Sequence, residues 1–312
     1  MLRDARDYQI LFLALFLLLG LSMRDWTLKP EVIAIAISTC LLTQGMLSFW
    51  MGRKSVSDSA PEEPEQSDLG TIPERFQGRR LLPSLQPVAW IRNLNWRSPL
   101  ITALGLSLLL RVDHWSTMAL AAFVAIASKF LCQVDGKHFF NPANIGIIAA
   151  LTLTHDAWVS PGQWGEEIWY ALIFLGAGGM VLKRVGRWDT TAMFFGSYAL
   201  MEAVRNCYLG WTWDVWSHRL MSGSLLLFAL FMVTDPRSIP NARPARLLWA
   251  FSLAVLTFVL RNWFYLPTAV FWALFILSPC TIGLDHLWKA ERFNWKGVMP
   301  RMPISGDPLV PR

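Results

Sequence analysis

Ten apolar runs constrain the fold of this 312-residue chain more than any other feature. Runs such as 10–19 and 264–278 contain no charged residue. Because a backbone in hydrocarbon must satisfy its own hydrogen bonds, runs of this length predict helices. The composition, 54% hydrophobic and 16% charged, excludes an ordinary soluble domain. The sequence therefore predicts an all-α, polytopic helical bundle whose first partner is the lipid bilayer.

The runs and the basic residues together predict a topology with about ten transmembrane helices. The N-terminus and the connections after the even-numbered runs carry most of the 28 Lys and Arg residues. Positive charge stays on the cytoplasmic side, so we expect a multi-pass protein of a bacterial-type inner (cytoplasmic) membrane with both termini in the cytoplasm. The expected spans are 8–23, 31–51, 99–112, 115–131, 141–155, 167–182, 190–209, 219–234, 245–260 and 263–284.

These spans divide the chain into four parts. The first two helices occupy 1–51, a cytoplasmic linker 52–98, an eight-helix membrane core 99–284 and a cytoplasmic tail 285–312. The linker begins as a polar, Pro-rich stretch that predicts disorder. It continues as 75–97, where arginines alternate with apolar residues, which favours contact with an anionic leaflet; docking of a cytoplasmic partner is the alternative.

Ten helices form two sets of five, and an odd number per set predicts a 5+5 inverted repeat. The third runs of the two sets, 99–112 and 219–234, are both short. Paired short segments at matched places line binding sites in such folds.

The first candidate site is the segment 135–146, at the cytoplasmic start of the fifth run. Its Asp-Gly pair predicts a turn, and Asn141 followed by proline predicts a capped helix start. Lys137, His138, Asn141 and Asn144 would face a phosphate, a carboxylate or a polarised ring carbonyl at the positive end of that helix. The alternative is a well-capped helix whose basic residues lie at the lipid headgroups.

The second candidate site is the eighth run. Ser222 and Ser224 mark a small-residue stretch that permits close approach of a helix or ligand. At the other end Thr234 and Asp235 precede a proline, which predicts a turn. A carboxylate at the edge of hydrocarbon needs a partner, so Asp235 either accepts a hydrogen bond from a ligand or pairs with one of Arg237, Arg243 and Arg246.

Three segments together resemble the family that contains RnfD and NqrB, membrane subunits of ion-translocating, flavin-dependent electron-transport complexes. Residues 139–143, Phe-Phe-Asn-Pro-Ala, look like that family's Asn-Pro-Phe-Asn-Pro-Ala segment. Residues 187–188, Arg-Trp, begin the seventh predicted helix as in that family. Residues 222–236 resemble the family's Ser-Gly-Ala-Thr run into Thr-Asp-Pro. The resemblance implies a ten-helix fold, a flavin, and partner redox proteins.

One departure from the family lies in the outer connection 155–167. Family members carry a covalent flavin on a threonine in a long insertion there, and this connection is short and has no threonine. We therefore expect no covalent flavin at that place. The shorter form resembles the UnbU branch, named from enediyne biosynthesis clusters, in which protein subunits of a biosynthetic complex are further candidate partners.

These observations predict an electron-transport subunit that holds a noncovalent flavin, FMN or riboflavin, or a quinone. Two alternatives stay open: a transporter or channel for an ion or small polar solute, and a membrane scaffold for a biosynthetic enzyme complex. Glu202, the main charge inside a run, favours transport, although Arg205 one turn on is its expected partner. We expect no metal site, no nucleic-acid partner and no dinucleotide or ATP site, and no catalytic residue is identifiable.

Overall fold

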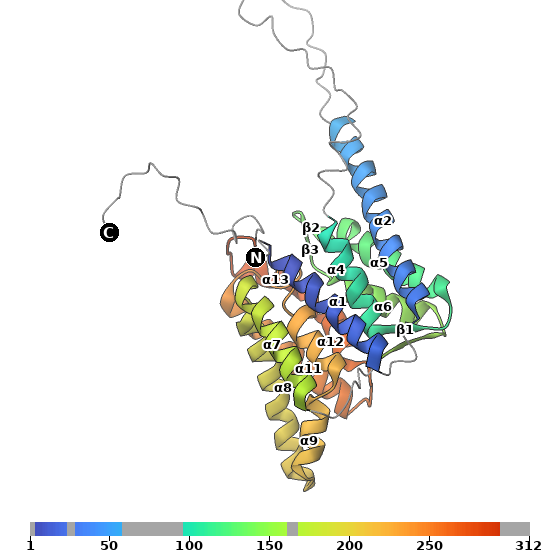
Figure 1. Ribbon diagram of the computed structural model, residues 1–312. Helices are drawn as coiled ribbons and strands as arrows, with labels where there is room; N and C mark the ends of the chain where they lie inside the picture. Colours follow the sequence, from blue (N-terminus) through green and yellow to red (C-terminus); the bar gives the residue numbers. More distant parts are fainter. Residues whose placement is uncertain (1–3, 24–28, 58–95, 161–167, 294–312) are drawn as a thin grey trace, which may run out of the picture.

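The computed structural model describes residues 4–23, 29–57, 96–160 and 168–293, and helices dominate this part of the chain (Figure 1). The all-α class predicted from the sequence is confirmed. The helices are α1 (Ala5–Met23), α2 (Pro30–Ser57), α4 (Arg97–Leu109), α5 (Trp115–Leu131), α6 (Pro142–Leu153), α7 (Ile168–Val185), α8 (Trp188–Leu209), α9 (Trp213–Leu220), α10 (Gly223–Leu227), the π-helix η2 (Phe228–Met232), α11 (Arg243–Asn262), α12 (Ala269–Leu277) and α13 (Cys280–Leu287).

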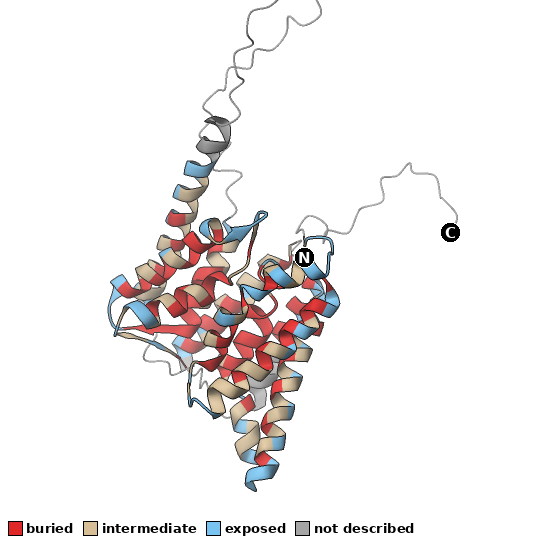
Figure 2. Ribbon diagram, turned by 180° about the vertical axis from the view of Figure 1, so that it is seen from behind, coloured by how far each residue is buried: buried red, intermediate tan, exposed pale blue. Residues whose placement is uncertain are grey.

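The helices form two groups. In the first group α2 packs against α4 and α5, and α5 packs against α6; in the second, α8 and α12 pack against α11, and η2 packs against α7 and α8. Helix α1 contacts both α4 and α7, and α6 contacts α12, so these helices join the groups (Figure 1). Buried residues concentrate where the helices meet (Figure 2).

Close packing within the first group depends on a glycine. A Cβ atom added at Gly146 of α6 would lie 2.6 Å from the backbone oxygen of Ala121 in α5. Because that contact is far shorter than van der Waals distance, only glycine lets the two helices approach so closely.

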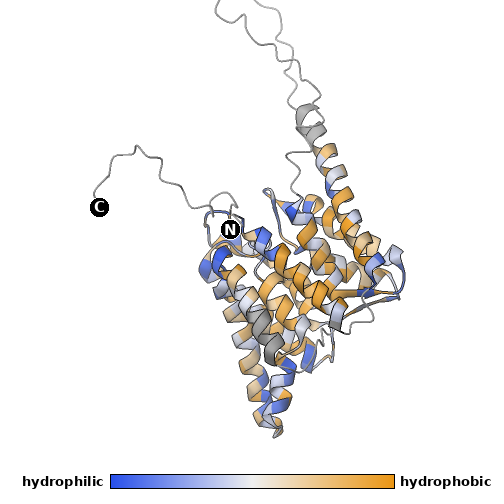
Figure 3. Cartoon of the chain, viewed as in Figure 1, coloured by the Kyte–Doolittle hydropathy of each residue, from blue (hydrophilic) through white to orange (hydrophobic). Residues whose placement is uncertain are grey.

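Apolar residues cover most of the helix surfaces (Figure 3), as a bilayer requires. Among the described residues three helices are long and apolar enough to cross a membrane, at 5–22, 30–51 and 243–262. Two bent pairs, α9 with α10–η2 and α12 with α13, bring the number to five if each pair is one span. Ten crossings and the 5+5 inverted repeat remain predictions.

Three predicted spans have different structures. The helix predicted at 99–112 ends at Leu109, because β1 (Leu110–Val112) pairs antiparallel with β4 (Ala157–Val159). The span predicted at 219–234 breaks after Leu220 with a bend of 52°. The span predicted at 263–284 bends by 47°, where Pro279 cannot donate a helical hydrogen bond.

One end of the molecule gathers the connections predicted to be cytoplasmic. The start of α1, the end of α2, α13 and the hairpin of β2 (Gln133–Val134) and β3 (Lys137–His138) all lie there (Figure 1). Most of the linker and tail lies outside the described residues, so its disorder and its contact with a leaflet stay predictions.

Candidate functional site

A local turn positions the first candidate residues. Asp135 and Gly136 have φ angles of 52° and 75°, and this left-handed pair closes the β2–β3 hairpin. The hairpin brings His138 against the turn that follows η2, where His138 Nε2 lies 3.8 Å from Asp235 Oδ2. His138 is buried, whereas the Asp235 side chain keeps 23% of its surface exposed.

Three neighbouring groups keep Asp235 charged. Burial alone would raise the pKa of the Asp235 carboxyl, but His138, the backbone N–H of Arg237 and the charge of Lys129 outweigh burial and hold that pKa below its ordinary value. Asp235 therefore stays ionised. The sequence left Asp235 either a ligand or one of three arginines as its partner, and Arg243 and Arg246 are not that partner, because they lie 3.4 and 2.8 Å from Asp189 instead.

Asn141 joins the two helix groups. Its Oδ1 accepts a hydrogen bond of 3.1 Å from the Asn144 backbone N–H, which caps α6 as the sequence predicted. Its Nδ2 donates to the Met232 carbonyl at the end of η2, at 3.3 Å. The start of α6 is thus held directly against the end of the π-helix.

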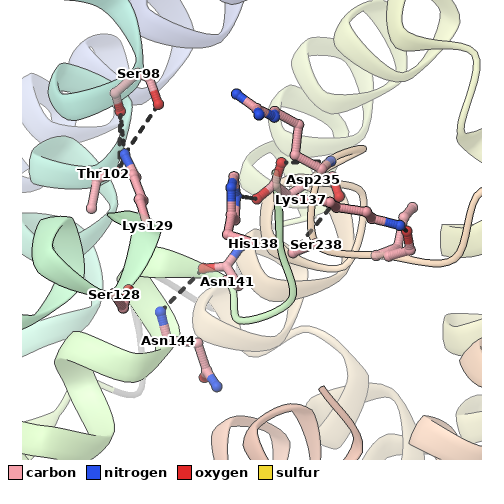
Figure 4. Close-up of polar contacts among 12 residues, drawn as sticks. Ser98, Thr102, Ser128, Lys129, Lys137, His138, Asn141, Asn144, Asp235 and Ser238 are labelled. Atoms are coloured by element: carbon pink, nitrogen blue, oxygen red, sulfur yellow. Dashed lines mark hydrogen bonds and ion pairs between the residues drawn. The ribbon is translucent and has the colours of Figure 1, made fainter. Parts of the chain in front are cut away.

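A cavity lies where these segments meet. It encloses about 980 Å³ of empty space, part of it open to solvent, between α1, α4, α7, η2 and the segments before α6 and after η2. Its polar lining includes Thr234 and three residues labelled in Figure 4, His138, Asn141 and Asp235. Apolar side chains form the remaining wall, among them Leu13, Ile101, Leu108, Val181, Leu227 and Phe231.

Four of the residues predicted for the site do not line this cavity. Lys137 Nζ points to the other side of the hairpin and lies 2.6 Å from Asp285 Oδ2. Burial lowers the pKa of Lys137, and Asp285 offsets only part of that effect. Asn144 is buried and donates to the Phe271 carbonyl at 3.1 Å. Ser222 and Ser224, whose hydroxyls lie 2.9 Å apart, are at the N-terminal end of α10.

The sequence reasoning missed Lys129. This residue lies in the last turn of α5, is only 8% exposed and lines the cavity. Its Nζ lies 3.1 Å from Ser98 Oγ and 3.0 Å from Thr102 Oγ1, both on α4 (Figure 4). The hydroxyl pair spaced four residues apart on α4 was the available signal, since such residues share one helix face.

Glu202, the charged residue that favoured a transport function, has other partners than the sequence predicted. Glu202 of α8 accepts hydrogen bonds from Tyr198, from Asn262 and, at 2.9 Å, from Arg219 of α9. Arg205, its predicted partner, lies over the Trp211 ring instead. Glu202 therefore belongs to a bonded network that holds α8, α9 and α11 together.

Comparison with known proteins shows which protein family this chain resembles. Residues 150–294 match the NQR2, RnfD, RnfE family. The resemblance to the RnfD/NqrB family is confirmed. The matched region includes η2 and the Thr234–Asp235 side of the cavity, and the Lys129 and Asn141 side precedes it.

Individual relatives support the same family. The chain is 30% identical over 129 residues to the RnfD subunit of the ion-translocating oxidoreductase complex of Vibrio vulnificus, covering 40% of this chain and 36% of the relative. It is 29% identical over 177 residues to the corresponding protein of Stutzerimonas stutzeri, covering 57% and 44%. The chain thus spans less than half the length of these relatives.

Proposed function

We propose that this protein is an electron-transport subunit of the bacterial inner membrane that holds a noncovalent flavin, FMN or riboflavin, in the cavity between its helix groups. Its termini lie in the cytoplasm, and other redox or biosynthetic subunits are its partners. The observation that carries the proposal is that His138, Asn141, Thr234 and Asp235, which come from two distant sequence segments, line one cavity.

The lining suits a flavin. Mostly apolar walls with a few convergent polar groups are typical of cofactor sites. The apolar wall on α4, α7 and η2 would hold the dimethylbenzene part of the ring, and the polar residues would hold its carbonyl and N–H groups. A quinone, which also has a flat ring with two carbonyls, is the second candidate.

Bound flavin supplies electron transfer in one-electron or two-electron steps. The chain's own residues bind and orient it. Asn141 is fixed by its two hydrogen bonds, and Asp235 is ionised and can accept a hydrogen bond from a ring N–H. The electron donor and acceptor would be partner proteins.

Purification from native membranes in mild detergent tests the proposal. We expect flavin absorbance in the visible spectrum and a flavin, identified by mass, after extraction. A matched variant, Asn141→Asp, places a second carboxylate in the cavity and should lower flavin retention more than Asn241→Asp, which lies outside the cavity lining. A folded, colourless preparation without flavin or quinone contradicts the proposal, and solute uptake by proteoliposomes without a redox partner would favour transport.

A further inference from the structure

Lys129 places a buried positive charge in the cavity wall. Its Nζ contacts the Ser98 and Thr102 hydroxyls and lies 3.5 Å from the Ser98 carbonyl, all neutral groups of α4. None of the ion pairs in the described part of the chain involves Lys129, so no carboxylate there lies within 4 Å of this ammonium.

A charge held in this way is unfavourable without an opposite charge nearby. A buried ammonium loses its hydration, and hydroxyl groups replace only part of that hydration. Ionisable groups inside a membrane bundle are for that reason found facing functional sites. Asp235, across the cavity, supplies part of that negative charge. An anionic group bound in the cavity that Lys129 borders would supply the rest.

Positive charges outnumber negative ones in the rest of the lining. Arg6 and Arg237 also line the cavity, and Asp235 is the carboxylate among the described lining residues. Asp235 is already in contact with His138, and Arg6 lies 2.5 Å from Asp4. Figure 4 shows Lys129 with its α4 hydroxyls on one side and the His138–Asp235 pair on the other. The Lys129 side is therefore the positive pole of the cavity.

We infer that Lys129 is a cofactor-binding residue that favours the reduced over the oxidised form of the flavin. The inference rests on the proposed function. When a donor protein supplies two electrons and one proton is taken up, the reduced ring carries one negative charge, which lies on its N1–C2 carbonyl edge. Placing that edge at Lys129 pairs the new charge with the buried ammonium, and charge near N1 is a known means of tuning a flavin.

Potentiometric titration of the riboflavin-loaded protein in detergent, with dithionite as reductant and visible absorbance as readout, tests the inference. We expect wild-type protein to hold riboflavin at a midpoint potential above that of free riboflavin at the same pH. Lys129→Met and Lys129→Gln should weaken the preference for reduced riboflavin about tenfold or more, a downward shift of about 30 mV or more for a two-electron couple. Lys129→Arg should keep most of the wild-type preference.

Arg243→Gln is the matched control, because it removes an exposed positive charge outside the cavity, and the potential should not change. A wild-type potential at or below that of free riboflavin overturns the inference without any variant. So does bound riboflavin whose potential is the same in wild type and Lys129→Gln. In both cases the flavin site stands, whereas folded wild-type protein that binds no riboflavin contradicts the proposed function itself.

Discussion

Replacing Asn141 separates its two structural roles. Asn141→Ala removes the cap of α6, a loss of about 1 kcal/mol, and the bond to the Met232 carbonyl, a loss of about 1 kcal/mol. The Met232 carbonyl also accepts a hydrogen bond from the Asp235 backbone N–H at 3.3 Å, so it is not left without a partner. We expect Asn141→Ala to lower the free energy of unfolding by about 2 kcal/mol.

Asn141→Ser is the matched variant. Serine caps a helix as well as asparagine does, but its shorter side chain cannot reach η2, so we expect a loss of about 1 kcal/mol. Unfolding by SDS in mixed micelles, followed by tryptophan fluorescence, measures both values. Equal losses in the two variants would refute the capping role, and no loss in Asn141→Ser would refute the contribution of the bond between the helix groups.

Two further predictions concern charged residues. Arg246→Met leaves the buried Asp189 carboxylate without its 2.8 Å partner and should lower the free energy of unfolding by about 3–5 kcal/mol in the same assay. Arg243→Gln removes an exposed arginine 3.4 Å from that carboxylate and should lower it by less than about 1 kcal/mol. Equal losses in the two variants would contradict this assignment. Because the pKa of Asp235 is lowered by folding, its ionised form stabilises the fold above the unfolded pKa of about 3.9, and this contribution is lost as pH falls through the folded pKa. Asp235→Asn should thus be less stable than wild type near neutral pH, and the difference should shrink in acid; a constant difference from neutral to acid pH would show that the effect is not ionic.

Local features of the fold could be predicted from the sequence, and long-range pairings could not. The Asp135–Gly136 turn and the Asn141 cap depend on neighbouring residues, so their geometry follows from residue type alone. The strand at 110–112 forms because residues 157–159 lie beside it, and no periodicity within an apolar run reveals such a partner. The sequence consequently predicts a continuous helix there.

In the cavity, too, the local features could be predicted from the sequence and the long-range contacts could not. His138 and Asp235 are both recognisable as polar residues at helix ends, but their contact spans nearly one hundred residues. The partners expected for Asp235 were a ligand or arginines closer in sequence. Lys129 ends an apolar run, where a lysine ordinarily extends to the lipid headgroups, and its hydroxyl partners lie about thirty residues earlier. Only the packing of α4 on α5 turns that lysine into a buried charge.

A ligand bound in this cavity would have a structural role as well as the proposed chemical one. Lys129 belongs to the first helix group and Asp235 follows η2 of the second, so a molecule that contacts both touches both groups. A ligand that binds only the native arrangement stabilises it in proportion to the logarithm of its concentration above the dissociation constant. Because Asn141 and Met232 already connect the groups at the same place, the ligand and this hydrogen bond stabilise one junction, and their effects on unfolding should not be additive.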